Sequence, residues 1–369
     1  MKKYILFPVA ALALFFTACS SDDSTEQTAE NLVPININAV VEGSGDTRAF
    51  VNTNLPHNTK VYVWADMINI SDNARTEYFN GWELKATSTN GTRLMRETTS
   101  DAKFFPATNV LDMWAMAGNF SGYSINSHNS LPVSPAYIYH TVRDDQTTAA
   151  AYYSSDLLYS QVRNQEPVDA TEGLTMKFYH MLSRVRVVLI PGNGDTTNDD
   201  YSNDVLRTAT VTLLDLETRA KFTPAKGVSM DDFAGTTGQP TRAAMITTAP
   251  KNVDDAPDYD PRRDIIVSTG VAAFDSNNNV TNDSYGDAVI VPQTVSAGNF
   301  IKVTLTDPGT GLTHDTYFRF ENDFTFEGGK QYQFLLTLDR IGETYSITPT
   351  ISSWINEEND RAIDMKQPQ

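Results

Sequence analysis

The longest strand-like run in the sequence is LTMKFYHMLSRVRVVLI, residues 174–190, and it stops at Pro191-Gly192-Asn193-Gly194. Apolar, β-branched and aromatic residues dominate the run, which favours a strand, and the Pro and Gly residues after it favour a turn. The run lies near the middle of the chain. We expect it to mark the junction between two halves, and we place the boundary just before residue 174.

Shorter runs with strand character recur on both sides of this one. They are residues 60–65, 82–86, 109–117, 137–142, 156–162, 209–216, 219–223, 264–268, 287–291, 300–306, 316–320, 330–339 and 345–351. Gly, Asn, Ser and Pro clusters separate them, and no apolar run at helical spacing exceeds a turn or two. The pattern predicts an all-β protein, and many short strands joined by turns indicate β-sandwiches.

Composition and charge restrict the class of protein further. The chain has 369 residues, of which 40% are hydrophobic and 10% aromatic, so it can build two folded domains. Its formal net charge of −18 at pH 7 argues against binding to nucleic acid or to anionic lipid, because phosphates repel acidic proteins. No long apolar run follows residue 19, so we expect any membrane attachment to be through acyl chains.

The first 18 residues read as an export signal. Met1-Lys2-Lys3 is cationic, and the apolar stretch 4–16 is too short to remain as a membrane-spanning helix. Cys19 follows the small residues Thr17 and Ala18, where a signal peptidase would cut. As the only cysteine in the chain, it cannot form an internal disulfide.

The segment FTAC, residues 16–19, resembles the lipobox of bacterial lipoproteins, although Phe16 stands where the family usually carries Leu. The resemblance implies that Cys19 is acylated and becomes the mature N-terminus. The following SSDD, residues 20–23, is similar to the acidic signal that sends lipoproteins of the Bacteroidetes to the outer face of the outer membrane. The alternatives are an ordinary signal peptide with an incidental cysteine, and a solvated acidic tether.

Residues 33–41 predict a half-buried strand in which apolar residues alternate with polar ones. Pro34 cannot donate a ladder hydrogen bond, so the strand begins there or lies on an edge. Residues 42–48 then form a polar, Gly-containing loop that ends at Arg48, and proteases cut such loops. The side chains expected to face the core are Val33, Ile35, Ile37, Ala39 and Val41.

Five landmarks in order resemble those of the fimbrillin family of Bacteroidetes, the FimA/Mfa-like pilins. They are residues 156–159, 178–185, 291–294, 326–334, and 347–351 with Trp354. The resemblance implies two tandem transthyretin-like Greek-key β-sandwich domains, lipoprotein export, cleavage by a trypsin-like protease behind an arginine, and assembly with other pilin subunits into type V pili. The protein would thus start as an outer-membrane lipoprotein precursor and end in a cell-surface fimbria.

Arg48 is the only Lys or Arg between Lys3 and Lys60, so we predict cleavage between Arg48 and Ala49. The alternative is that Arg48 is a solvent-facing loop residue. The expected organisation is a signal peptide at 1–18, an acylated tether with the first strand and the cleavable segment at 19–48, an N-terminal sandwich at 49–173 that strand 33–41 completes, a C-terminal sandwich at 174–351, and a tail at 352–369.

Cleavage would let strand 33–41 leave a groove that a C-terminal strand from a neighbouring subunit could fill. Pro349 disfavours a central place for residues 345–351 in their own sheet. The alternative is that this run closes the second sandwich and that the tail is disordered. The candidate donor residues are Tyr345, Ile347, Ile351, Trp354, Ile355 and Ile363.

No catalytic, cofactor or metal motif is present in the sequence. It lacks G-x-S-x-G and a phosphate-binding Gly loop, and Cys19 is unavailable as a nucleophile once acylated. The acidic runs 195–200 and 254–255 lack the spacing of a calcium loop. The long polar loops 227–261 and 275–284 are expected to bind something or to order on assembly. The histidines do not have the spacing of metal ligands; they are His57, His128, His140, His180 and His314. We expect His180 to be partly buried and hydrogen-bonded.

Two functions of different classes therefore remain. The first is a structural and adhesive fimbrial subunit whose adhesion ligand, host or bacterial, the sequence does not name. The second is a monomeric surface lipoprotein that binds glycan through exposed aromatics such as Trp82, Trp114 and residues 137–139. A glycosidase β-domain ranks third, and we interpret the protein as a non-enzyme.

Overall fold

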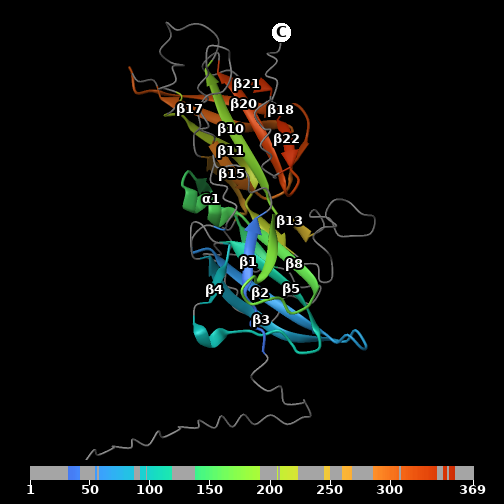
Figure 1. Ribbon diagram of the computed structural model, residues 1–369. Helices are drawn as coiled ribbons and strands as arrows, with labels where there is room; N and C mark the ends of the chain where they lie inside the picture. Colours follow the sequence, from blue (N-terminus) through green and yellow to red (C-terminus); the bar gives the residue numbers. More distant parts are fainter. Residues whose placement is uncertain are drawn as a thin grey trace, which may run out of the picture.

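The computed structural model describes residues 32–41, 55, 58–86, 92–96, 98–118, 138–191, 206, 208–222, 245–249, 260–267, 286–306, 309–338, 344–346 and 349–353. Figure 1 shows two β-rich units stacked end to end, with β1 to β5 and β8 in one and β10, β11, β15, β17, β18 and β20 to β22 in the other. The predicted all-β fold is confirmed. The assignment of both units to the transthyretin-like class stays a prediction.

The first unit is a seven-stranded sheet in the order β1-β9-β8-β5-β2-β3-β4. β1 runs parallel to β9, and every other neighbouring pair in this sheet is antiparallel. A 3-10 turn at Thr99–Asp101 follows the last strand. The strands are β1 (Ile37–Val41), β2 (Lys60–Ile68), β3 (Arg75–Ala86), β4 (Leu94–Arg96), β5 (Val110–Gly118), β8 (Leu158–Gln165) and β9 (Leu174–His180).

The second unit contains the other sheets, of four, six, three and two strands. The four-stranded sheet has the order β15 (Gly286–Ile290), β10 (Ser183–Pro191), β20 (Lys330–Leu338), β22 (Thr350–Ser353). The six-stranded sheet has the order β21 (Thr344–Ser346), β18 (Thr313–Phe320), β17 (Gly298–Thr306), β11 (Thr210–Glu217), β14 (Arg262–Val267), β7 (Asp145–Gln146). The small sheets are β13 (Ile246–Thr248), β12 (Arg219–Phe222), β6 (Ile138–Thr141) and the pair β16 (Thr294–Val295), β19 (Phe324–Thr325).

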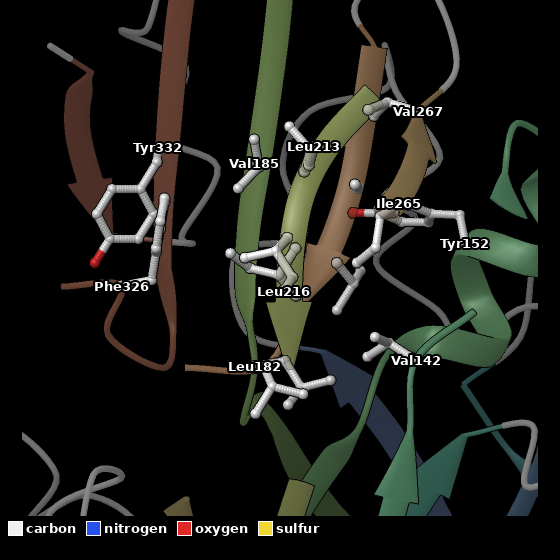
Figure 2. Close-up of a cluster of buried hydrophobic side chains, with 14 of the residues drawn as sticks. Val142, Tyr152, Leu182, Val185, Leu213, Leu216, Ile265, Val267, Phe326 and Tyr332 are labelled. Atoms are coloured by element: carbon white, nitrogen blue, oxygen red, sulfur yellow. The ribbon is translucent and has the colours of Figure 1, made fainter. Parts of the chain in front are cut away.

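Alternating apolar residues of these strands build the second core. Figure 2 shows Val185 of β10 and Leu213 of β11 within it, together with Ile265 of β14. β20 turns one face to this core, because Tyr332 and Phe334 are buried with the leucines that follow at the same period. Helix α1 (Ala149–Ser155) adds Tyr152, and the Thr148 hydroxyl caps the helix by accepting from the Ala151 N–H.

The two cores meet across the first sheet, because its central strands are buried on both faces. In β2, Val61 and Val63 belong to the core of the first unit, whereas Tyr62 and Trp64 pack with the core of the second. β5 divides its side chains in the same way. This explains why both strands read as nearly continuous apolar runs and not as alternating ones.

The chain crosses between the units more often than we predicted. The run 174–190 is two strands, and the chain changes sheets between His180 and Ser183, not before residue 174. β6 and β7, which we expected in the N-terminal sandwich, pair with β12 and β14 of the second unit. Side-chain hydrogen bonds set this placement, since the Gln146 amide both donates to and accepts from the backbone of Val289 at 2.8 Å.

Among the residues that the structure describes, no helix is long and apolar enough to cross a bilayer. Cys19, Arg48 and Ala49 lie outside the described residues. The same holds for the donor candidates Ile347, Trp354, Ile355 and Ile363, for the acidic runs 195–200 and 254–255, and for His57 and His128.

Candidate functional site

The first strand, β1, is one end of the first sheet and also hydrogen-bonds to the chain just before β4, at the other end. On one side β1 pairs with β9 from Ile37 to Val41, and the Leu174 N–H donates to the Asn36 carbonyl at 2.7 Å. On the other side the Ala39 N–H donates to the Thr92 carbonyl at 2.8 Å. Residues 32–41 therefore close the sheet around its core.

The same backbone ladder continues before β1. The Ile35 N–H donates to the Lys103 carbonyl and the Phe105 N–H donates to the Val33 carbonyl, both at 2.8 Å. Isolated bridges join Pro34 to Phe104 and Asn38 to Arg93. If this strand left, a row of backbone groups on each side would lose its partners.

The alternating side chains of this strand occupy the core of the first unit, as the period-two pattern predicts. Ile35, Ile37, Ala39 and Val41 are buried, and Val33 is partly buried against the same cluster. Met176 and Phe178 of β9 belong to that cluster. The strand is thus part of the core itself and does more than cover it.

The outward side chains of the strand contact a loop that connects β8 to β9. The Asn36 Nδ2 donates to the Ala170 carbonyl at 2.8 Å, and the Asn38 Nδ2 donates to the Glu172 carbonyl at 2.7 Å. Arg93 approaches the same loop from the other side, where its guanidinium donates to the Ala170 carbonyl at 2.8 Å. We call residues 169–173 the acceptor loop.

The C-terminal donor candidates are divided between two sheets. We predicted residues 345–351 as one strand, but β21 lies at the edge of the six-stranded sheet and β22 at the edge of the four-stranded sheet. Pro349, which has no N–H to donate, stands between them. Tyr345 lies on β21, and Ile351 on β22 is 54% exposed.

A buried ion-pair cluster joins β10 to its neighbours where the two units meet. Arg184 donates to Asp287 of β15 at 2.6 Å and to the Gln331 side chain of β20 at 3.0 Å, and Arg186 donates to Asp287 at 3.2 Å. Burial opposes ionisation of Asp287, but the two guanidinium groups outweigh it and hold the pKa of Asp287 below its ordinary value.

The glycine-rich turn before β20 packs against the passage from β9 to β10. The Ser183 hydroxyl donates to the Glu327 carbonyl at 2.9 Å, and the Gly329 N–H donates to the Leu182 carbonyl at 2.7 Å. A Cβ on Gly328 would lie 2.5 Å from the Met181 carbonyl oxygen, so only glycine fits there. Two of the sequence landmarks therefore meet at the junction of the units.

The histidines in the described part of the chain have structural surroundings. His180 is buried and its Nδ1 donates to Asp156 at 2.9 Å, as expected for a hydrogen-bonded core histidine. His140 is buried, its Nε2 donates to the Ser155 carbonyl at 2.8 Å, and burial lowers its pKa. Within the described residues, no group of three His, Cys, Asp or Glu could hold a metal ion.

The aromatic residues proposed for glycan stacking lie mostly inside the protein. Trp82 is only 5% exposed and its ring meets Phe79 edge to face, and Trp114 is 3% exposed. Tyr139 is half-buried beneath the guanidinium of Arg219. Neither tryptophan is therefore accessible for stacking on a glycan.

Comparison with models of protein families assigns the chain to a family. Residues 47–354 match the model of the fimbrillin-like family, which is most of the sequence. The chain belongs to the fimbrillin-like family. The resemblance of the five landmarks is confirmed, and the family is one of fimbrial and not enzymatic proteins. The sequence matches none of the curated proteins.

Solved structures share the fold of this fimbrillin-like protein. A proposed cell adhesion protein from Bacteroides ovatus is 13% identical with a TM-score of 0.55, and the match covers 89% of this chain and 100% of that one. A proposed cell adhesion protein from Bacteroides uniformis is also 13% identical, with a TM-score of 0.51 and the same coverage. Identities this low establish likeness of fold alone.

Sequence reasoning missed the contacts outside the core of this fimbrillin-like chain. Asn36 and Asn38 were read only as the outward positions of a strand, and their acceptors are 134 residues away. Nothing near Arg93 or in residues 169–173 signals such a contact, apart from the turn residues Asp169 and Gly173.

Proposed function

We propose that this chain is a structural and adhesive subunit of a cell-surface fimbria. In this proposal Cys19 is acylated on export and anchors the precursor in the outer membrane. An Arg-specific, trypsin-like protease then cuts between Arg48 and Ala49, and the subunit joins other pilin subunits by strand exchange. The observation that carries the proposal is that residues 33–41 fill the core of the first unit and yet precede the predicted cut.

The energetics of the first strand explain why its loss would drive assembly. Burial of each large side chain such as Ile35, Ile37 or Val41 contributes about 1.5–3 kcal/mol. The backbone hydrogen bonds to β9 on one side and to residues 92–105 on the other are lost at the same time. An open groove with two unpaired sheet edges is therefore unfavourable, and a strand from another subunit relieves it.

The arrangement of the C-terminal strands supports them as the source of the donor. β21 and β22 are short edge strands of the second unit, with ladders of three and four residue pairs. Few hydrogen bonds are broken when such a strand leaves its sheet. The exposed Ile351 would gain burial in a groove lined by apolar side chains.

Polymerisation of purified full-length protein tests this function. Limited trypsin treatment should release a chain that begins at Ala49 and forms ladders on a gel run without boiling. Arg48→Ala should abolish the cut and the ladder, and Ile351→Asp should keep the cut but weaken the ladder. Ladders of undiminished length from both variants would rule out the proposal.

Lipidation is tested separately in cells. Wild-type protein should incorporate a labelled fatty acid, and Cys19→Ala should not, because stable anchoring requires acyl chains on this residue. Labelling that persists in the Cys19→Ala variant would place the acyl chains elsewhere.

A further inference from the structure

The acceptor loop, residues 169–173, presents backbone carbonyls to whatever strand lies in the groove. The Ala170 and Glu172 carbonyls accept the amides of Asn36 and Asn38. These carbonyls precede β9, which begins at Leu174, so the ladder between β1 and β9 does not use them. The loop thus adds side-chain recognition to a groove that otherwise binds backbone and apolar groups.

The acceptor loop also has internal hydrogen bonds that do not involve the first strand. The Asp169 carboxylate accepts from the Thr171 N–H at 2.7 Å and from the Thr171 hydroxyl at 2.6 Å, and these bonds lower the pKa of Asp169. The Gly173 N–H donates to the Asp169 carbonyl at 2.8 Å. Because none of these contacts involves residues 33–41, they favour the same turn when another strand enters.

The fit of the loop to the strand is close. Gly173 has φ of +75°, and a Cβ there would lie 3.0 Å from the Asn36 carbonyl oxygen and 3.1 Å from the Asn38 Nδ2. A bulkier residue in the loop would thus push the second asparagine away. Glycine allows both the left-handed backbone and the approach of this amide.

The charges at this place select among polar side chains. An ionised carboxylate has no proton to donate, so Asp or Glu opposite the loop would leave the Ala170 and Glu172 carbonyls without these hydrogen bonds. The Arg93 guanidinium, which donates to the Ala170 and Thr171 carbonyls, disfavours a second cation beside it. A hydroxyl on Ser or Thr is shorter than the asparagine amide. A neutral amide meets all these conditions.

We propose that the acceptor loop and Arg93 form a site for amide side chains. The site favours, as the replacement for residues 33–41, a strand with Asn or Gln at two outward positions two residues apart. β21 and β22 contain neither residue, so the site favours a strand of a different pilin subunit over these strands of a second copy. This inference rests on the strand exchange proposed above. The core requires apolar side chains on the inward face of the incoming strand, and the acceptor loop adds a preference for amides on its outward face.

Hydrogen exchange on the uncleaved full-length chain tests the site without any polymerisation. In the double variant Asn36→Asp, Asn38→Asp, the backbone amides of Ile35 and Ala39 should exchange faster than in the wild type. The expected increase is about three- to tenfold for each side-chain hydrogen bond lost, because that ratio corresponds to the net free energy of a typical hydrogen bond. Asn299→Asp, which changes an exposed asparagine on β17, is the matched control and should leave these amides unchanged. Unchanged exchange in the double variant would overturn the proposal.

Peptide capture tests the selectivity for an incoming strand. The full-length protein is treated with trypsin in the presence of a labelled peptide of sequence VPININAVV, residues 33–41, or of versions with both asparagines replaced by Gln, Ser or Asp. The Asn and Gln peptides should be retained, and the Ser and Asp peptides should bind at least about tenfold more weakly. Equal retention of all four would overturn amide selection. If no peptide were captured, strand exchange itself would fail, and the exchange rates of the uncleaved variants would still decide whether the amide site exists.

Discussion

β1 of the first unit and β10 of the second each run parallel to a neighbouring strand, but they are held by different forces. β1 pairs with β9 over five residues, and its outward amides bond to a loop. β10 pairs with β20 over eight residues and carries two arginines that share the buried Asp287. Apolar contacts and neutral hydrogen bonds can be reproduced by another strand of similar pattern. Desolvated charges cannot be separated from their partners without a large penalty, so removing β10 from its sheet costs more than removing β1.

Asp287→Ala should have the largest effect on the free energy of unfolding, and it tests how strongly the ion pairs hold β10 in its sheet. Removal of the carboxylate leaves the buried Arg184 and Arg186 without their shared counter-ion, which costs about 3–5 kcal/mol in the free energy of unfolding. The measurement is a urea titration followed by tryptophan fluorescence. Asp144→Ala, at an exposed position before β7, is the control and should change the free energy by less than about 0.5 kcal/mol. Equal effects of the two variants would refute the role of the ion pairs.

Ile37→Ala should destabilise the first unit by about 2–5 kcal/mol, because it leaves a cavity in a packed core. Faster amide exchange is expected in β1 and β9, with little change in β10. Val40→Ala on the outward face of the same strand is the control. An equal increase in the amide exchange of β10 would contradict the conclusion that β1 and β10 are held by different forces.

Ala39→Leu tests the same core by adding volume instead of removing it. The Ala39 side chain is buried in the first core, so three more carbon atoms should overpack the groove and cost about 1–3 kcal/mol. Val40→Leu, which adds volume on the outward face, should be nearly neutral. Urea midpoints of the uncleaved chain measure both effects, and a neutral Ala39→Leu would show that the groove tolerates a large residue at this position.

The smallest effect is the pH dependence from His140 of β6 in the second unit. Burial lowers the pKa of His140, and its bond to Ser155 and the charge of Asp156 offset this only in part. Below an unfolded pKa of about 6.5, the unfolded chain therefore binds a proton that the folded chain does not. Stability should fall from pH 7 to pH 5 by up to about 1.4 kcal/mol per pH unit from this group.

Replacement of the imidazole isolates that contribution. His140→Gln should show a shallower loss of stability than the wild type over the same pH range, measured as the difference between urea midpoints at pH 7 and pH 5. Parallel loss in the two proteins would assign the pH dependence to other groups.

The sequence alone indicated most of the longer strands and, in two of them, which side chains face a core. Alternation in residues 33–41 and 330–338 is a local property that depends on the period of the pleat, and the buried residues follow it. Gly329 has a positive φ at the tight turn into β20, a backbone conformation that glycine adopts without strain.

Only the tertiary structure decided which strands become neighbours. Residues 174–190 carry one continuous apolar pattern, yet β9 and β10 belong to different sheets. Asn36 and Asn38 look like any outward polar residues until the fold brings residues 169–173 beside them. A period of two specifies a face and not a partner, because partners are chosen by hydrogen bonds and charge pairs between residues far apart in the chain.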